Sequence, residues 1–298
     1  MNEQPVLELL FDIFEDSIKK IYQIEKGNYL DLICKTAKNL SEGEILIECS
    51  EEDEKYLEEL YAKVSDIDFN VEDIRKCVML HVLRAFKEQN ISYAYHTPDK
   101  ISQIMSFIAV KLVEPNKPFN LLDPFCGTGN LLFTFLNNLN NDNATTYACD
   151  IDSQLSILCS DIANLLDYQV DVYNQDCKTS YFSNMDLVIS DLNDTEDLIE
   201  NISYNLNTLK ENGYMVLLTP QRVLSDNEFK TNLLSQASLL GVINFDKELF
   251  KNDSKTILII KKELNNKNCL LMEIPSFDKK TDFTKKILEL QNWLERKR

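Results

Sequence analysis

Glycine, histidine and long hydrophobic runs are scarce in this chain. Only six glycines, two histidines and one tryptophan occur in 298 residues. No uninterrupted apolar stretch approaches the roughly 18 to 20 residues that a membrane-spanning helix needs. The first residues, Met-Asn-Glu-Gln-Pro, lack the basic region of a secretory signal peptide. We therefore expect a cytoplasmic protein with no membrane partner.

The eight cysteines show no spacing that is typical of a metal site. No two of them form a Cys-x-x-Cys pair, and most lie within apolar runs. The cytoplasm keeps such thiols reduced, and a buried free cysteine behaves as a small apolar residue. We therefore predict neither a disulfide framework nor a metal site.

Basic side chains are scarcest in the middle of this acidic chain, whose net charge is −18. Residues 95–218 carry 17 acidic and 5 basic side chains, whereas residues 219–298 carry 11 acidic and 15 basic ones. A protein that binds duplex DNA neutralises several phosphates with Lys and Arg. If nucleic acid is a partner, residues 219–298 must supply that charge; otherwise the acidity serves solubility.

Hydrophobic periodicity separates a helical part of the chain from a part in which strands alternate with helices. Apolar side chains recur at helical spacing in four early stretches: 5–25, 28–40, 51–65 and 70–88. Seven short apolar or β-branched runs follow: 119–123, 145–150, 170–175, 185–190, 213–219, 241–245 and 255–261. Helical stretches separate the early runs: 130–139, 153–167 and 195–210. This alternation predicts parallel βαβ units.

The predicted fold is α/β, with a Rossmann-like sheet of seven strands of which the last is antiparallel. We expect an α-helical subdomain over residues 1–94, a cofactor-binding domain over 95–275 and a C-terminal helix over 276–298.

Two of the six glycines lie one residue apart and mark a candidate binding site. The sequence Asp-Pro-Phe-Cys-Gly-Thr-Gly-Asn, residues 123–130, follows the first predicted strand and precedes a helix. Such a loop turns backbone N–H groups and a helix N-terminus toward a polar ligand. The next two strands end in Asp150 and Asp176, and ligands of doubly wound sheets bind at the carboxyl ends of strands. Tight turns and helix N-caps are the alternative interpretation, but three acids at three successive strand ends favour a nucleoside-type ligand.

In that site, Asp150 is expected to accept hydrogen bonds from the hydroxyl groups of a ribose. Asp176 is suited to accept a hydrogen bond from an exocyclic amine such as that of adenine, with the backbone N–H of Cys177 beside it.

Residues 123–130 resemble motif I of the S-adenosylmethionine-dependent methyltransferases of the N6-adenine DNA type. The sequence is most similar to the modification subunits of type I restriction systems. Upstream, Tyr-His-Thr-Pro-Asp at 95–99 is similar to that family's F/Y-T-P motif, and 220–224, 241–245 and 255–260 resemble its later strands. The resemblance covers about residues 95–262.

The resemblance implies a class I methyltransferase fold with S-adenosylmethionine as cofactor. It places Asp123 on the methionine part of the cofactor, Asp150 on the ribose and Asp176 at adenine, and implies that residues 96–98 contact the carboxylate. The residues predicted to bind the cofactor are His96, Thr97, Pro98, Asp123, Phe125, Cys126, Gly127, Thr128, Gly129, Asn130, Asp150, Ile151, Asp176 and Cys177.

The sequence departs from this family after the fourth strand. Adenine methylases carry N/D-P-P-F/Y there: the first residue accepts hydrogen bonds from the target amine, and the aromatic ring stacks on a flipped-out base. Here the segment is Asp191-Leu-Asn-Asp194. Asp191 stands where the acceptor belongs, and Asp194 replaces a ring whose stacking is worth roughly 1–3 kcal/mol. We predict Asp191 as the catalytic residue and little methyl transfer to duplex DNA.

Three functions remain open at this point. The chain is a methyltransferase for a nucleic-acid amine that Asp191 orients, a methyltransferase for a protein or small molecule, or a regulatory protein that binds the cofactor without methyl transfer. A basic patch of residues 219–298 beside the cleft favours the first function, and a closed, uncharged pocket over Asp191 favours the second. A cleft blocked by the helical subdomain or a partner chain favours the third. His96 is a further candidate base, whereas His81, on an apolar helical stretch, is better explained as structural.

Overall fold

The N-terminal part of the chain folds into four long helices. The computed structural model describes residues 5–114, 116–139, 143–246, 254–264 and 268–296. The first helices are α1 (Val6–Ile24), α2 (Tyr29–Glu42), α3 (Glu51–Ala62) and α4 (Val71–Gln89). Asn28, Ser50 and Asn70 begin α2, α3 and α4, because each side chain accepts a backbone N–H three residues further on. The four predicted helical stretches are therefore present with similar bounds.

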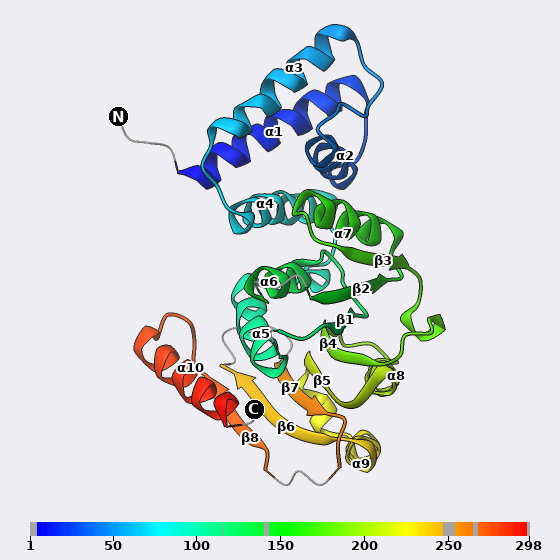
Figure 1. Ribbon diagram of the computed structural model, residues 1–298, viewed down its shortest axis with the longest axis vertical. Helices are drawn as coiled ribbons and strands as arrows, with labels where there is room; N and C mark the ends of the chain where they lie inside the picture. Colours follow the sequence, from blue (N-terminus) through cyan, green and yellow to red (C-terminus); the bar gives the residue numbers. More distant parts are fainter. Residues whose placement is uncertain (1–4, 115, 140–142, 247–253, 265–267, 297–298) are drawn as a thin grey trace.

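Most strands alternate with helices in the rest of the described chain, whereas β6, β7 and β8 are consecutive elements (Figure 1). The strands are β1 (Phe119–Asp123), β2 (Ala144–Asp150), β3 (Val170–Asn174), β4 (Met185–Asp191), β5 (Leu209–Pro220), β6 (Ser238–Phe245), β7 (Lys255–Lys261) and β8 (Leu270–Ile274). The helices are α5 (Asp99–Leu112), α6 (Asn130–Leu139), α7 (Ser153–Leu165), α8 (Leu198–Thr208), α9 (Asn227–Gln236) and α10 (Lys280–Glu295). The predicted C-terminal helix is thus α10.

The described strands form one sheet in the order β3-β2-β1-β4-β5-β7-β6-β8. β7 lies antiparallel between β5 and β6, and the other neighbouring pairs are parallel. The Rossmann-like arrangement with an antiparallel strand over 255–261 is confirmed, but the predicted count of seven strands is wrong by one. β8 adds to the edge beside β6, where Met272 and Ile274 are buried while Leu271 is 78% exposed. Apolar residues on both faces of β8 hide the alternation that would have revealed it.

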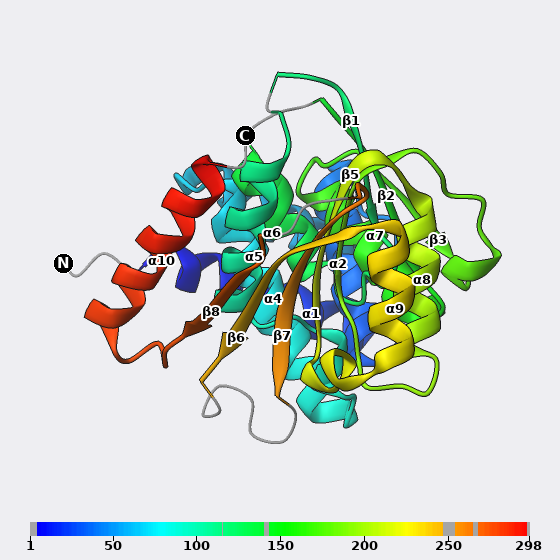
Figure 2. The ribbon, with the colours of Figure 1, turned by 90° about the horizontal axis from the view of Figure 1, so that it is seen from below.

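Successive residues of the central strands point to opposite faces of the sheet, and each face has its own helices. Leu121 belongs to a core shared with α5, α6 and α7, whereas Leu122 belongs to a second core under α8 and α9. Figure 2 shows α8 and α9 on one side of the sheet, with α5, α6 and α10 on the other.

The N-terminal helices share the larger of these two cores. α2 packs against α7, and α4 contacts both α1 and α6. Phe14 and Phe86 of the helical part lie in the same cluster of buried side chains as Leu121 of the sheet. The division of the chain near residue 94 stays a prediction.

The state of the cysteines and the apolarity of the helices bear on two expectations drawn from the composition. All eight cysteines are free, and six of them are buried. Among the described residues, no helix combines the length and the apolarity that crossing a bilayer requires.

Candidate functional site

A cavity of about 230 Å³ lies where β1, β2 and β4 end. These strands are parallel neighbours, so their carboxyl ends meet at one edge of the sheet, where ligands of doubly wound folds bind. The lining comes from the segment before α5, the loop after β1 with the start of α6, the ends of β2 and β4, and the segment after β4 with the start of α8. It consists of Ala94, Tyr95, Thr97, Asp123, Phe125, Cys126, Gly127, Leu131, Asp150, Ile151, Asp191, Leu192, Asn193, Thr195, Asp197, Leu198 and Asn201.

Both glycines of the loop after β1 occupy positions that other residues would fill only with strain. Gly127 has φ +52°, and a Cβ there would lie 2.4 Å from the carbonyl oxygen of Tyr95. Gly129 has φ +76°, and its Cβ would lie 2.3 Å from the ring of Phe133. L-residues with a side chain rarely adopt such φ values. The loop therefore needs glycine both for its turn and for the close approach of its neighbours.

The segment that precedes α5 lies directly against this loop. Thr128 donates its backbone N–H to the carbonyl oxygen of Tyr95 at 3.1 Å, and its hydroxyl lies 3.0 Å from Nδ1 of His96. The side-chain amide of Asn130 donates to the carbonyl oxygen of Thr97 at 2.8 Å. The two motifs that the sequence placed about 30 residues apart are thus joined by three hydrogen bonds.

Asp150 ties the end of β2 to the same loop. Its Oδ2 accepts the backbone N–H of Gly127 at 2.8 Å, and its Oδ1 accepts that of Asp152 at 2.9 Å. Burial raises the pKa of Asp150, and these two N–H groups counter that rise. Each carboxylate oxygen has a second lone pair, which remains available to a ligand hydroxyl.

Asp123, at the end of β1, is the most deeply buried acid of the cavity. It is 1% exposed, and the N–H of Phe125 reaches its Oδ1 at 3.3 Å. Burial raises the pKa of Asp123 to about 8, and the neighbouring carboxylates of Asp150 and Asp191 add to the rise. A cationic ligand would relieve this accumulation of negative charge.

Only half of the fourteen predicted cofactor residues line this cavity: Thr97, Asp123, Phe125, Cys126, Gly127, Asp150 and Ile151. Thr128, Gly129 and Asn130 support the loop from behind. His96 and Pro98 instead line a second, apolar cavity together with Met79 and Leu83. Burial lowers the pKa of His96 to about 4, so the ring is neutral near pH 7.

Asp176 and Cys177 lie outside the set of lining residues. Asp176 caps a short 3-10 helix, and its Oδ1 accepts the N–H of Lys178 at 2.9 Å. Cys177 is 1% exposed, and burial raises the pKa of its thiol to about 12. Their assignment to the base of a nucleoside stays a prediction.

Asp191, the predicted catalytic residue, lies at the cavity and forms an ion pair. Nζ of Lys255, at the start of β7, is 2.5 Å from its Oδ1, and the two side chains are only 14% and 9% exposed. Thr97 lines the same cavity as Asp191. Burial raises the pKa of Asp191, while Lys255 and Thr97 oppose that rise. Lys255 was missed from the sequence because it reaches the site only through the antiparallel pairing of β7.

Further ion pairs fix the segment between β4 and α8. Nε of Arg222 lies 2.5 Å from Oδ1 of Asp194, and its Nη2 donates to the carbonyl oxygen of Thr195 at 3.0 Å. Nζ of Lys178 lies 3.3 Å from Oδ2 of Asp197. Asp194, which stands in place of the family's aromatic ring, therefore faces an arginine.

Asn201, on α8, is a cavity residue that the sequence did not predict. It is 8% exposed, and its Oδ1 has no hydrogen-bond partner. A buried acceptor without a partner is destabilising, by about 1–3 kcal/mol. The side chain lines the cavity, which makes Asn201 a candidate ligand contact, although Oδ1 itself is buried. An asparagine within a helical stretch carries no local signal for this role.

In the described part of the chain, the histidines and acids do not form a second candidate functional site. The ring of His81 stacks on Phe11 at 4.0 Å, and its Nδ1 lies 3.1 Å from the Tyr29 hydroxyl. This placement among the N-terminal helices agrees with a structural role. No group of His, Cys, Asp and Glu within the described ranges is arranged to hold a metal ion.

Comparison with solved structures identifies the class of fold. A putative class I S-adenosylmethionine-dependent methyltransferase from Listeria monocytogenes superposes with a TM-score of 0.82, at 24% identity, over 97% of this chain and 99% of that chain. A modification subunit of a putative type I restriction enzyme from Vibrio vulnificus superposes with a TM-score of 0.58, at 15% identity, over 80% of this chain and 61% of that chain. The chain therefore has the class I methyltransferase fold.

Comparison of sequences, rather than structures, finds a family that matches the N-terminal helices. The family model of the YtxK N-terminal helical domain matches residues 8–86. An uncharacterized protein of Bacillus subtilis, YtxK, is 34% identical over 139 residues, which are 46% of this chain and 42% of that protein. The matched segment therefore spans less than half of this relative.

Proposed function

We propose that the cavity at the ends of β1, β2 and β4 binds S-adenosylmethionine and that the chain is a methyltransferase. The observation that carries this proposal is the arrangement of Asp123 and Asp150 around Gly127, with Thr97 closing the same cavity. When bound, S-adenosylmethionine supplies a methyl group on a positively charged sulfur. The fold shared with the Listeria and Vibrio proteins and the resemblance of residues 123–130 to motif I support the assignment.

We assign each cavity residue a role in ligand binding from its chemistry. Asp150 accepts ribose hydroxyls with its free lone pairs. Asp123 has a raised pKa in the free protein, and a bound cation beside it would favour its ionised, negatively charged form. Ile151, 74% exposed at the rim, offers an apolar surface to a base. Asn201 lines the same cavity from α8 and is a candidate further contact.

The acceptor side fits adenine in duplex DNA poorly. Lys255 already neutralises Asp191, so an acceptor amine must compete with a lysine for that carboxylate. Asp194 binds Arg222 and offers no ring on which a flipped base could stack. Lys255 and Arg222 are basic residues of the C-terminal third. Because each is already paired with an aspartate, neither offers an unpaired positive charge to a phosphate. We therefore place the methyl acceptor in another class, protein or small molecule.

A second function is favoured by the same ion pair. If Lys255 holds Asp191 permanently, the chain binds the cofactor and transfers no methyl group. It would then act as a cofactor-dependent regulator.

Two measurements separate these possibilities. Isothermal titration calorimetry with S-adenosylmethionine is expected to show one site per chain, and absence of heat would remove both functions. Methyl-tritiated cofactor is then incubated with the protein and with DNA, RNA, protein and small-molecule fractions of a cell extract. Label in protein or small molecules supports the first function, label in adenine of duplex DNA refutes our choice of acceptor, and binding without transfer supports the second function.

A further inference from the structure

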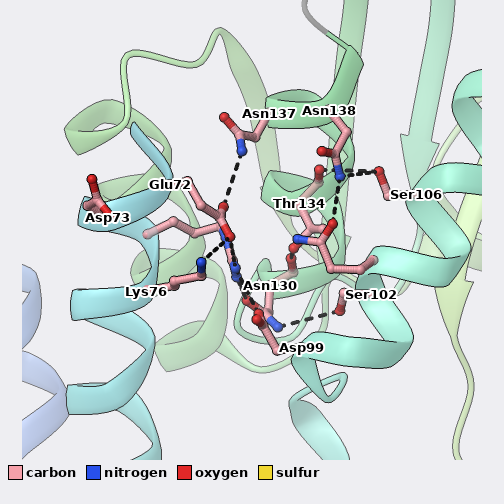
Figure 3. A network of polar contacts seen from close by, with 12 residues as sticks. Glu72, Asp73, Lys76, Asp99, Ser102, Ser106, Asn130, Thr134, Asn137 and Asn138 are labelled. Carbon is pink, nitrogen blue, oxygen red and sulfur yellow. Dashed lines mark hydrogen bonds and ion pairs between the residues drawn. The ribbon is translucent and has the colours of Figure 1, made fainter. Parts of the chain in front are cut away.

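A charged residue from the N-terminal helices is buried behind the cofactor loop. Arg75, on α4, is 1% exposed. Its Nε and Nη2 donate to the carboxylate of Glu72 at 2.7 and 2.8 Å, and Nη2 also donates to Oδ1 of Asp99 at 2.8 Å. Figure 3 shows Glu72, Asp99 and Asn130 converging on this point between the α4, α5 and α6 ribbons.

The remaining arm of Arg75 determines how Asn130 is oriented. Nη1 donates to Oδ1 of Asn130, the last residue of the glycine loop motif. A guanidinium only donates hydrogen bonds, so it selects the amide orientation that turns Oδ1 toward Arg75. The amide nitrogen of Asn130 then faces the carbonyl oxygen of Thr97 and donates to it at 2.8 Å.

Thr97 carries this connection to the reaction side of the cavity. Thr97 lines the cavity together with Asp191, which in turn contacts Lys255. Two consecutive hydrogen bonds therefore connect Arg75 of α4, through Asn130, to Thr97 at the cavity. The elements that they join are far apart in the sequence and include the N-terminal helices.

We propose that Arg75 is a positioning residue: it sets the amide of Asn130, and through it the Tyr95–Thr97 segment that closes the cofactor cavity. The effect on cofactor affinity rests on the proposed function, whereas the effect on the loop does not. The N-terminal helices thereby become a working part of the cofactor site rather than a separate attachment.

Substitutions of Arg75 and Asn130 separate positioning from simple stabilisation. Arg75→Met removes all donors, and Arg75→Lys keeps the charge but loses the planar fork that serves three partners at once. Asn130→Asp retains an acceptor for Arg75, and strengthens that contact with a charge, but removes the donor to Thr97. A structural role of the ion pair alone predicts that Asn130→Asp is harmless. The control is Val82→Ala, which removes buried volume from the same helix without touching the network.

The first measurement is amide hydrogen exchange of the protein without cofactor. We expect Arg75→Met, Arg75→Lys and Asn130→Asp to speed exchange of the Thr128 amide about tenfold, in line with the loss of one charge-assisted hydrogen bond. Val82→Ala should speed exchange of the Thr128 amide no more than its own decrease in Tm accounts for. If Arg75→Met fails to fold, the comparison rests on Arg75→Lys and Asn130→Asp. Exchange at Thr128 that is equal in all variants and the wild type would overturn the proposal.

The second measurement is calorimetric affinity for S-adenosylmethionine. Arg75→Met and Asn130→Asp should each raise Kd about tenfold, and the double variant should raise it little further, because the residues act in series. Equal Kd values for Val82→Ala and Arg75→Met at matched Tm would contradict a positioning role. If the wild type binds no cofactor, the proposed function fails, while the exchange data still decide the role of Arg75.

Discussion

Nζ of Lys255 lies 2.5 Å from Oδ1 of Asp191, so the candidate catalytic carboxylate is paired with a lysine from the antiparallel strand β7. This contact joins the end of β4 to the start of β7. It determines the charge that any methyl acceptor meets.

Lys255→Met should destabilise the protein by about 3–5 kcal/mol near pH 8, as expected when a buried ion pair loses one partner. Burial raises the pKa of Asp191, and removing Lys255 raises it further. A group with a raised folded pKa contributes stability at low pH that is lost as pH rises through that pKa. The deficit should therefore shrink at pH 5, as measured by urea unfolding at both pH values.

Lys261→Met, on the same strand, provides the control for this variant. Lys261 pairs with Glu263 at 2.7 Å, and both side chains are more exposed than those of the Lys255 pair. Its cost should be smaller. Adding Asp191→Asn to Lys255→Met should recover stability, and a deficit that persists in the double variant would contradict the ion-pair explanation.

Asp123→Asn should stabilise the cofactor-free protein, and the gain should grow with pH. Burial raises the pKa of Asp123 to about 8, far above that of an unfolded aspartate. Wild-type stability contributed by this group is therefore lost as pH rises toward 8, by up to about 1.4 kcal/mol per pH unit. Urea unfolding between pH 4 and 9 measures the gap, which should level off above pH 8. Asp171→Asn, at an exposed position of β3, should change stability by less than about 0.5 kcal/mol throughout.

Asp150→Ala should abolish measurable cofactor binding. The substitution removes the acceptors for ribose hydroxyls and leaves the N–H of Gly127 without its 2.8 Å partner. The loss of two charge-assisted hydrogen bonds corresponds to about a hundredfold or more in Kd. Calorimetry with S-adenosylmethionine checks this, with Asp171→Ala as the control. Unchanged affinity of Asp150→Ala would refute the ribose assignment.

Asn201→Leu should affect stability and binding in opposite directions. Leucine has a similar size and removes the buried Oδ1 that has no partner, so the free protein should be unchanged or more stable by about 1 kcal/mol. Cofactor affinity should fall about tenfold, because the ligand loses an acceptor. Thermal unfolding and calorimetry on one sample give both values. Asn232→Leu, exposed on α9, should leave Kd unaltered; an equal Kd for Asn201→Leu would show that the ligand does not use this oxygen.

Gly127→Ala should destabilise the protein far more than Gly43→Ala. Both glycines have positive φ, +52° and +68°, so each alanine carries the strain of the left-handed region, about 1–2 kcal/mol. Around Gly43 a Cβ meets nothing within 4 Å, whereas at Gly127 it would lie 2.4 Å from the Tyr95 carbonyl oxygen. We expect a total of about 3 kcal/mol or more at Gly127. Similar urea midpoints for the two variants would mean that the Tyr95 segment moves away freely.

Local chemistry made much of the fold predictable from the sequence. The helix over 130–139 and the strand over 119–123 were predicted with the bounds that the structure has, because a glycine turn separates two dense apolar runs. The positions of Asp123 and Asp150 at neighbouring strand ends followed from the βα alternation. β8 was missed because its apolar residues lie on both faces, and α9 because its ten residues carry little amphipathic pattern.

The partners of the site could not be predicted in the same way. Asn201 lines the cavity, and Lys255 and Arg222 pair with Asp191 and Asp194, through strand order and helix packing that no spacing in the sequence encodes. Asp176 shows a related limit: its place after a strand predicts a ligand contact, and its Oδ1 also caps the next turn, so the position alone does not distinguish the two roles. Side chains at strand ends serve the backbone as readily as they serve a ligand.

The packing of α2 on α7, within a core that extends from Phe14 to Leu121, has a consequence for how such a protein can change over time. A substitution that enlarges a side chain on α7 must be matched by a smaller one on α2. We therefore expect that a chimaera carrying the amino-terminal helices of another protein would be destabilised unless the α2–α7 contact is rebuilt.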